Sequence, residues 1–128
     1  MPPDTPPCPH PLVPLPKLLD PLRDQVQVWA QPVRVVRRIY LFGSTLRLKP
    51  NPRDLDLAME LDVPDTEFIR ASTGVQSAWS RGLGEIIGRK IDVQFSHPTF
   101  PVVWGALQID GCAILFERLS NVIELRSM

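Results

Sequence analysis

The segment Arg53–Leu61 alternates strictly between polar and apolar residues, and this pattern constrains the fold more than any other feature. One face carries Leu55, Leu57 and Met59, and the other carries Asp54, Asp56, Ala58 and Glu60. Because successive side chains of a strand point to opposite faces, the segment is predicted to be a strand with one face in the core. The segment Ile91–Phe95 alternates in the same way, with Asp92 and Gln94 on its polar face. We therefore expect a β-sheet whose polar face carries carboxylates.

The remaining patterns alternate between helix and strand. In chain order they predict a helix from Asp20-Pro21 to before Pro32, a strand over Val33–Phe42, a long helix from Pro64-Asp65 to a C-cap at Gly88, a short helical turn around Trp104 and Leu107, and a last strand over Cys112–Phe116. Gly74, Gly82 and Gly84 weaken the long helix and favour a break near its end. This order predicts an α/β (α+β) fold, a single domain with a mixed sheet of about four strands flanked by helices.

Prolines are concentrated at the start of the chain, where eight of the 15 lie within the first 16 residues. Proline fixes φ and has no backbone N–H, so residues 1–16 are predicted to be an extended, disordered tail. A proline-rich ligand for a partner is the alternative, although composition alone specifies no partner. Residues 17–128 are then the working domain, which is long enough to bury a core without disulfides or a structural metal.

The charge balance excludes some classes of function. The chain has 14 Lys and Arg against 14 Asp and Glu, which argues against a dedicated nucleic-acid or membrane-surface binder.

No apolar run approaches the ~18–20 residues of a membrane span, and the N-terminus lacks the pattern of a signal peptide. Cys8 and Cys112 are too few for a cysteine-rich zinc site, and Cys112 is expected in the core. We therefore expect a cytoplasmic protein with no membrane partner.

Three carboxylates are the first candidates for chemistry. Asp54 and Asp56 project from the same face of one predicted strand, and Asp92 projects from the polar face of another. If these strands are neighbours, the three carboxylates converge and repel one another, which suppresses their ionisation. Mg²⁺ prefers carboxylate oxygens together with substrate phosphates, so it would resolve this conflict. Two such ions ~3.5–4 Å apart can clamp the attacking and leaving oxygens of an in-line phosphoryl or nucleotidyl transfer.

The part of such a site that binds phosphate is predicted at Phe42-Gly43-Ser44. Glycine after a buried strand lets the backbone approach a ligand closely, and Ser44 is a good N-cap for a helical turn that favours an anion. Arg47 is the best placed counter-charge for a triphosphate, with Lys49 and Arg53 in the same loop. Taken alone, Gly-Ser is more often a cap and Asp-x-Asp more often a solvated strand face. It is therefore the order of the Gly-Ser, Asp-x-Asp and Asp92 segments along the chain that favours a functional site over these commoner alternatives.

That order resembles the polymerase β-type nucleotidyltransferase superfamily. The matching residues are Leu41-Phe42-Gly43-Ser44, Asp54-Leu55-Asp56-Leu57-Ala58 and Lys90-Ile91-Asp92-Val93. The closing segment Gly111–Glu117 is similar to the last strand of the smallest members, the minimal nucleotidyltransferases. The resemblance covers about residues 20–118.

The resemblance implies a role for each matching residue. Gly43 and Ser44 would hold the β- and γ-phosphates of ATP, and Arg47 matches a basic residue of many minimal members. Asp54 and Asp56 would bind two Mg²⁺ ions, and Asp92 would complete the catalytic metal site and help activate the attacking hydroxyl. The chain departs from the pattern in three ways: Leu48 replaces a frequent glycine, Arg53 replaces a small serine or threonine, and the loop from Ser44 to Asp54 is about one residue shorter.

The resemblance also implies a function, the transfer of AMP from ATP to a hydroxyl. Minimal members are commonly paired with a helical HEPN-type ribonuclease toxin, so this chain would be the antitoxin that adenylylates a tyrosine on that partner. The alternative, which Arg53 and the short loop favour, is a non-catalytic module that neutralises its partner by contact. RNA 3′-end nucleotidyl transfer is a third reading, which the zero net charge disfavours. Homo- and hetero-oligomers both stay open.

Overall fold

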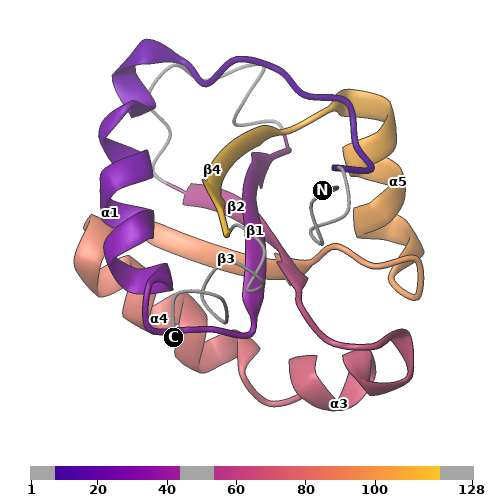
Figure 1. Cartoon of the computed structure of the whole chain (residues 1–128). Coiled ribbons are helices and arrows are strands. Elements are labelled where there is room, and N and C mark those ends of the chain that lie inside the picture. Colours follow the sequence, from indigo (N-terminus) through magenta and orange to yellow (C-terminus); the bar gives the residue numbers. More distant parts are fainter. Residues whose placement is uncertain (1–7, 44–53, 119–128) are drawn as a thin grey trace, which may run out of the picture.

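The computed structural model describes residues 8–43 and 54–118, and Figure 1 shows their arrangement. In chain order the elements are η1 (Lys17–Leu19), α1 (Pro21–Ala30), β1 (Val36–Phe42), β2 (Asp54–Leu61), η2 (Asp65–Glu67), α3 (Phe68–Ser72), α4 (Gln76–Ile87), β3 (Lys90–Phe95), α5 (Pro101–Asp110) and β4 (Ala113–Glu117), where η marks a 3-10 turn. The strands form a four-stranded sheet in the order β3-β2-β1-β4. Strands β2 and β3 are parallel, and the other neighbours are antiparallel. The predicted fold class is confirmed.

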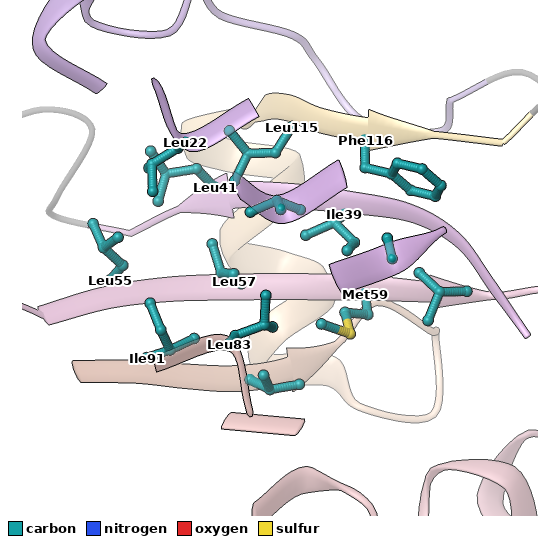
Figure 2. Close-up of a cluster of buried hydrophobic side chains, with 14 of the residues drawn as sticks. Leu22, Ile39, Leu41, Leu55, Leu57, Met59, Leu83, Ile91, Leu115 and Phe116 are labelled. Atoms are coloured by element: carbon teal, nitrogen blue, oxygen red, sulfur yellow. The ribbon is translucent and has the colours of Figure 1, made fainter. Parts of the chain in front are cut away.

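The alternation in β2 and β3 produces two different faces of the sheet. Leu55, Leu57 and Met59 are fully buried, whereas Asp54 is exposed and Asp56 is half-buried. The helices α1 and α4 cover the apolar face and complete the main core. Figure 2 shows Leu22 of α1 and Leu83 of α4 among the aliphatic side chains of the strands. Burying an aliphatic side chain of this size contributes about 1.5–3 kcal/mol, so this face determines how the strands are oriented.

The opposite face of the sheet has a smaller core beneath α5. It consists of Tyr40, Phe42, Ala58, Leu107 and Cys112, all buried. The expectation that Cys112 is a core residue is confirmed. In Figure 1, α5 lies on the other side of the sheet from α1 and α4. Among the described residues, no helix has the length and apolar composition needed to cross a membrane.

The N-terminal segment differs from the predicted disordered tail over residues 8–16. The N–H of Cys112 donates to the carbonyl of Pro11 (3.0 Å), and the N–H of Val13 donates to the carbonyl of Cys112 (2.9 Å). Leu15 is also buried. Proline lacks only the donor, so a proline-containing segment can still pair at the edge of a sheet, where half of its polar groups face away. Residues 1–7 lie outside the described residues, as does that part of the tail prediction.

The long helix predicted between Pro64 and Gly88 is divided into η2, α3 and α4. The break falls at Gly74, which has a φ of +86°, rather than near the end as predicted. Gly82 and Gly84 are accommodated inside α4. At Gly82 an added Cβ would lie 3.3 Å from the indole Nε1 of Trp29, so glycine allows α1 to pack closely against α4. Gly88 is the left-handed C-cap that the sequence predicts, with a φ of +78°.

Shorter segments also differ from the sequence prediction in length. The first strand begins at Val36 rather than at Val33, and the turn around Trp104 is a helix of 10 residues, α5. Both differences lie at the ends of elements or in short patterns, where the local signal is weakest.

Arg38 forms a buried ion-pair network on the α5 side of the sheet. Its side chain is 2% exposed and donates to both oxygens of Glu60 (2.8 and 3.0 Å) and to Glu117 (2.6 Å). The hydroxyl of Tyr40 donates to Oε2 of Glu60 (2.8 Å), and burial raises the pKa of Tyr40, so the phenol stays protonated. The buried polar groups of this network, which come from three strands, therefore pair with one another: Arg38, Tyr40, Glu60 and Glu117.

We expect Arg38→Ala to lower the free energy of unfolding by about 3–5 kcal/mol, because it leaves Glu60 without its buried counter-charge. Urea denaturation followed by circular dichroism measures this change. The neighbouring Arg37, which pairs with Glu60 and Asp62 at the surface, is the matched control. Arg37→Ala should cost less than about 1 kcal/mol. Equal losses in the two variants would contradict a dominant role for the buried network.

Candidate functional site

The register of the sheet brings Asp56 and Asp92 together. Strands β2 and β3 run parallel with Asp56 opposite Asp92 and with Asp54 opposite Lys90. On the other side of β2, Phe42 is the partner of Asp56, so Gly43 follows immediately beside this row. The end of β1 and the two carboxylates of β2 and β3 thus meet at one end of the sheet.

All three predicted carboxylates line one cavity of about 530 Å³. Its lining residues are Asp54, Asp56, Lys90, Ile91 and Asp92 from the strands and Gln76, Ser77 and Ser80 from α4. The sheet therefore brings the carboxylates to a common space, as the alternation of the two strands predicts. The first turns of α4 form the remaining wall.

The electrostatics of the cavity show most clearly at Asp56. Burial raises the pKa of this carboxyl, and the negative charges of Asp92 and then Asp54 raise it further. Each of these causes disfavours the ionised form. The three acidic side chains are thus close enough to repel one another, which is the conflict that a divalent cation relieves.

Gly43 has a structural reason to be glycine. Its φ is +86°, a conformation that side chains other than glycine rarely adopt, and an added Cβ would lie only 2.9 Å from Oδ2 of Asp56. The backbone at Gly43 therefore approaches the carboxylate as closely as the chain allows. The two other residues predicted to bind nucleotide, Ser44 and Arg47, lie outside the described residues.

Three polar side chains that the sequence did not single out contact Asp92 or the backbone of the next residue, Val93. Gln94 donates from Nε2 to Oδ2 of Asp92 (2.9 Å). From α4, Gln76 donates to the carbonyl of Val93 (2.6 Å), and Ser80 accepts from the N–H of Val93 (3.1 Å). Strand β3 is at the edge of the sheet, so these two contacts satisfy polar groups that have no neighbouring strand. The spacing i, i+4 of Gln76 and Ser80 is the only signal in the sequence that places both on one helix face.

The donor set fits Mg²⁺ by its chemistry, because carboxylate oxygens are the protein ligands that this hard cation prefers. Asp54, Asp56 and Asp92 are the residues that would hold it. Within residues 8–43 and 54–118, no group of three or more His, Cys, Asp or Glu side chains lies close enough together to hold a metal ion. The fit to Mg²⁺ therefore rests on the chemistry of the three carboxylates and not on a preformed geometry.

His10 is a buried titratable side chain outside the acidic cavity. Its ring lies between Ser96 (2.8 Å from Nε2) and Gln108 (2.9 Å from Nδ1), and it packs edge-on against Tyr40 and Trp104. Burial lowers its pKa, although the charge of Glu60 acts in the opposite direction. This histidine fastens the N-terminal segment to the domain and does not line the acidic cavity.

Comparison with known proteins supports the fold. No protein-family model matches the chain, and no curated protein sequence matches it. Among solved structures, a chain in the crystal structure of the toxin-antitoxin MntA-HepT is similar, with a TM-score of 0.50 and 14% sequence identity over 76% of this chain and 71% of that one. At this identity the likeness shows the fold alone. The chain has a nucleotidyltransferase-like fold, in which the acidic cavity lies at the start of β2 and β3.

We expect Asp56→Asn to raise the melting temperature at pH 7 in EDTA. The pKa of Asp56 is higher in the folded protein than its ordinary value of 3.8, so the unfolded chain loses this proton first as the pH rises. The free energy of unfolding of the wild type therefore falls over that range, and Asn removes this penalty. The difference should disappear as the pH falls below 3.8, where both states are protonated.

Scanning calorimetry from pH 3 to pH 7 checks this, with Glu85→Gln on the exposed side of α4 as the control. The control should change the melting temperature little at either pH. A wild type as stable as Asp56→Asn at pH 7 would contradict a raised pKa for Asp56 in the folded protein.

Proposed function

We propose that this chain is a Mg²⁺-dependent nucleotidyltransferase that transfers AMP from ATP to a hydroxyl on a protein partner, as the antitoxin of a toxin-antitoxin pair. The observation that carries the proposal is the cavity lined by Asp54, Asp56 and Asp92, with Gly43 against Asp56. The likeness of the fold to a chain in the structure of the toxin-antitoxin MntA-HepT supports the proposal.

Each of the described site residues would have a separate role in such a reaction. A side chain at Gly43 would collide with the carboxylate of Asp56, so glycine lets this backbone stay beside Asp56. Gln94 fixes one oxygen of Asp92 and so orients the other. Mg²⁺, when bound by the three carboxylates, would supply the positive charge that a triphosphate needs among acidic groups. Ser44 and Arg47 complete the phosphate side in this proposal.

The partner is proposed on two grounds. The similar solved structure is that of a toxin-antitoxin, which favours a protein as the molecule that carries the acceptor hydroxyl. A helical HEPN-type toxin is the partner that the sequence motifs imply.

Transfer to the partner tests the proposal directly. With α-labelled ATP, Mg²⁺ and the product of the adjacent gene, we expect label on the partner. Asp54→Asn and Asp92→Asn should each reduce the rate at least about 100-fold, because each removes a charge that acts on the reacting groups. Partner binding by the two variants should be unchanged. Intact partner binding without ATP binding or transfer by the wild type would instead favour the non-catalytic module.

The close approach of Gly43 to Asp56 can be tested separately with a matched pair of variants. Gly43 and Gly74 have the same φ of +86°, but an added Cβ at Gly74 meets nothing within 4 Å. Both alanine variants should lose about 1–2 kcal/mol of stability from backbone strain. Only Gly43→Ala should weaken Mg²⁺-ATP binding, at least about tenfold by titration calorimetry. Equal affinities in the two variants would show that Gly43 has only a structural role.

A further inference from the structure

A second cavity of about 250 Å³ lies beside the acidic one. It is lined by Ser72, Thr73, Gly74, Gln76, Gln94, Phe95, Phe100 and Val103. These residues come from the break between α3 and α4, the end of β3 and the start of α5. The roles proposed above for the carboxylates and for Gly43 leave this cavity unassigned.

Two glutamines connect the second cavity to the first. Gln76 lines both cavities. Gln94 lines the second cavity and donates to Oδ2 of Asp92, which lines the first. The second cavity therefore adjoins Asp92, two residues further along β3.

The walls of the second cavity define the chemistry of a group that would fit. Phe95, Phe100 and Val103 supply an apolar surface. Gln76 and Gln94 both use Nε2 as a donor within the protein, and among the described residues nothing donates to either Oε1. The cavity thus combines apolar walls with hydrogen-bond acceptors.

The second cavity offers no counter-charge for a phosphate among the described residues that line it, since none of their side chains is charged. An apolar group that carries one hydroxyl fits both features, since the hydroxyl can donate to an amide oxygen while its carrier packs on the aromatic rings.

The order of the strands gives the cavity its place in the reaction. In an in-line displacement, the attacking and leaving oxygens lie on opposite sides of the phosphorus. Gly43 follows β1, on the far side of β2 from Asp92, so the row runs from Gly43 through Asp56 to Asp92. If the leaving pyrophosphate lies at the Gly43 end, the attacking oxygen comes from the Asp92 end, where the second cavity opens.

We propose that this cavity is the acceptor subsite, which binds the apolar group that carries the attacking hydroxyl. The assignment rests on the proposed function for the reaction itself. The acceptor oxygen forms a bond to the α-phosphorus of ATP, and the bond from that phosphorus to the oxygen bridging to the β-phosphate breaks. Pyrophosphate leaves with that electron pair, and the hydroxyl proton passes to the carboxylate of Asp92 and then to water.

Binding of small probes tests the subsite without any turnover. We expect phenol to shift the side-chain amide NMR signals of Gln76 and Gln94, with saturation in the millimolar range. Anisole has the same ring without the donor, so it should bind about three- to tenfold more weakly. Adenosine should leave the amide of Gln94, which lines the second cavity and not the first, unshifted. A shift of Gln94 caused by adenosine, or no shift caused by phenol up to about 50 mM, would overturn the assignment.

Three tryptophan variants show whether the cavity itself is responsible. Thr73→Trp and Val103→Trp should fill it and abolish the phenol shifts, whereas Val102→Trp, at a position that is 85% exposed on the same helix, should leave them unchanged. Thr73 is exposed, so its variant is expected to fold even if replacement of the half-buried Val103 destabilises the protein. Phenol binding that survives Thr73→Trp would overturn the assignment.

A transfer assay then separates this inference from the proposed function. Thr73→Trp should raise the KM for the acceptor at least about tenfold and leave the affinity for Mg²⁺-ATP unchanged. If the wild type binds phenol at the glutamines but transfers nothing, the proposed function fails while the cavity's selectivity stands. If the wild type transfers AMP and Thr73→Trp does so with an unchanged KM, the subsite fails and the function stands.

Discussion

The parallel pairing of β2 with β3 is the interaction on which the rest of this structure depends. Burial of Leu57 and Val93 on the helix-covered face forces Asp56 and Asp92 onto the other face, opposite each other. A shift of one residue in either strand would expose its apolar side chains, at a cost of about 1.5–3 kcal/mol for each. The hydrophobic core therefore holds the carboxylates together against their mutual repulsion, and the pKa of Asp56 is raised first by burial and then by that repulsion.

The parts of the fold that the sequence predicted are those that local patterns determine. Alternation in β2 and β3 is visible because each strand has one face in the core, and Gly88 marks a helix end because its φ of +78° suits glycine. Once these strands are neighbours, the common cavity of Asp54, Asp56 and Asp92 follows from the alternation alone. That they are neighbours is a long-range property, which only the order of the motifs indicated.

The features that sequence reasoning missed depend on contacts between distant segments. Prolines near the N-terminus suggest a disordered tail, yet residues 8–16 pack against the domain, where the carbonyl of Pro11 pairs with Cys112. The sequence shows Arg37 and Arg38 as equivalent neighbours, but Arg38 alone is buried, between Glu60 and Glu117. The contacts of Arg38 with Glu117 and of Pro11 with Cys112 join residues 79 and 101 positions apart in the sequence. No local sequence pattern can predict them.

The helix break at Gly74, which the sequence pattern predicted nearer the end of the helix, has the most direct consequence for function. A continuous helix from Pro64 to Gly88 would carry Ser72 and Gly74 along one axis, whereas the turn at Gly74 separates α3 from α4, as Figure 1 shows. Helix α4 can then begin at Gln76, whose amide satisfies the exposed edge of β3 at Val93. The same break leaves residues 72–74 beside the end of β3 as one wall of the second cavity. An irregularity that protects the edge of the sheet thus also creates space for a ligand next to Asp92.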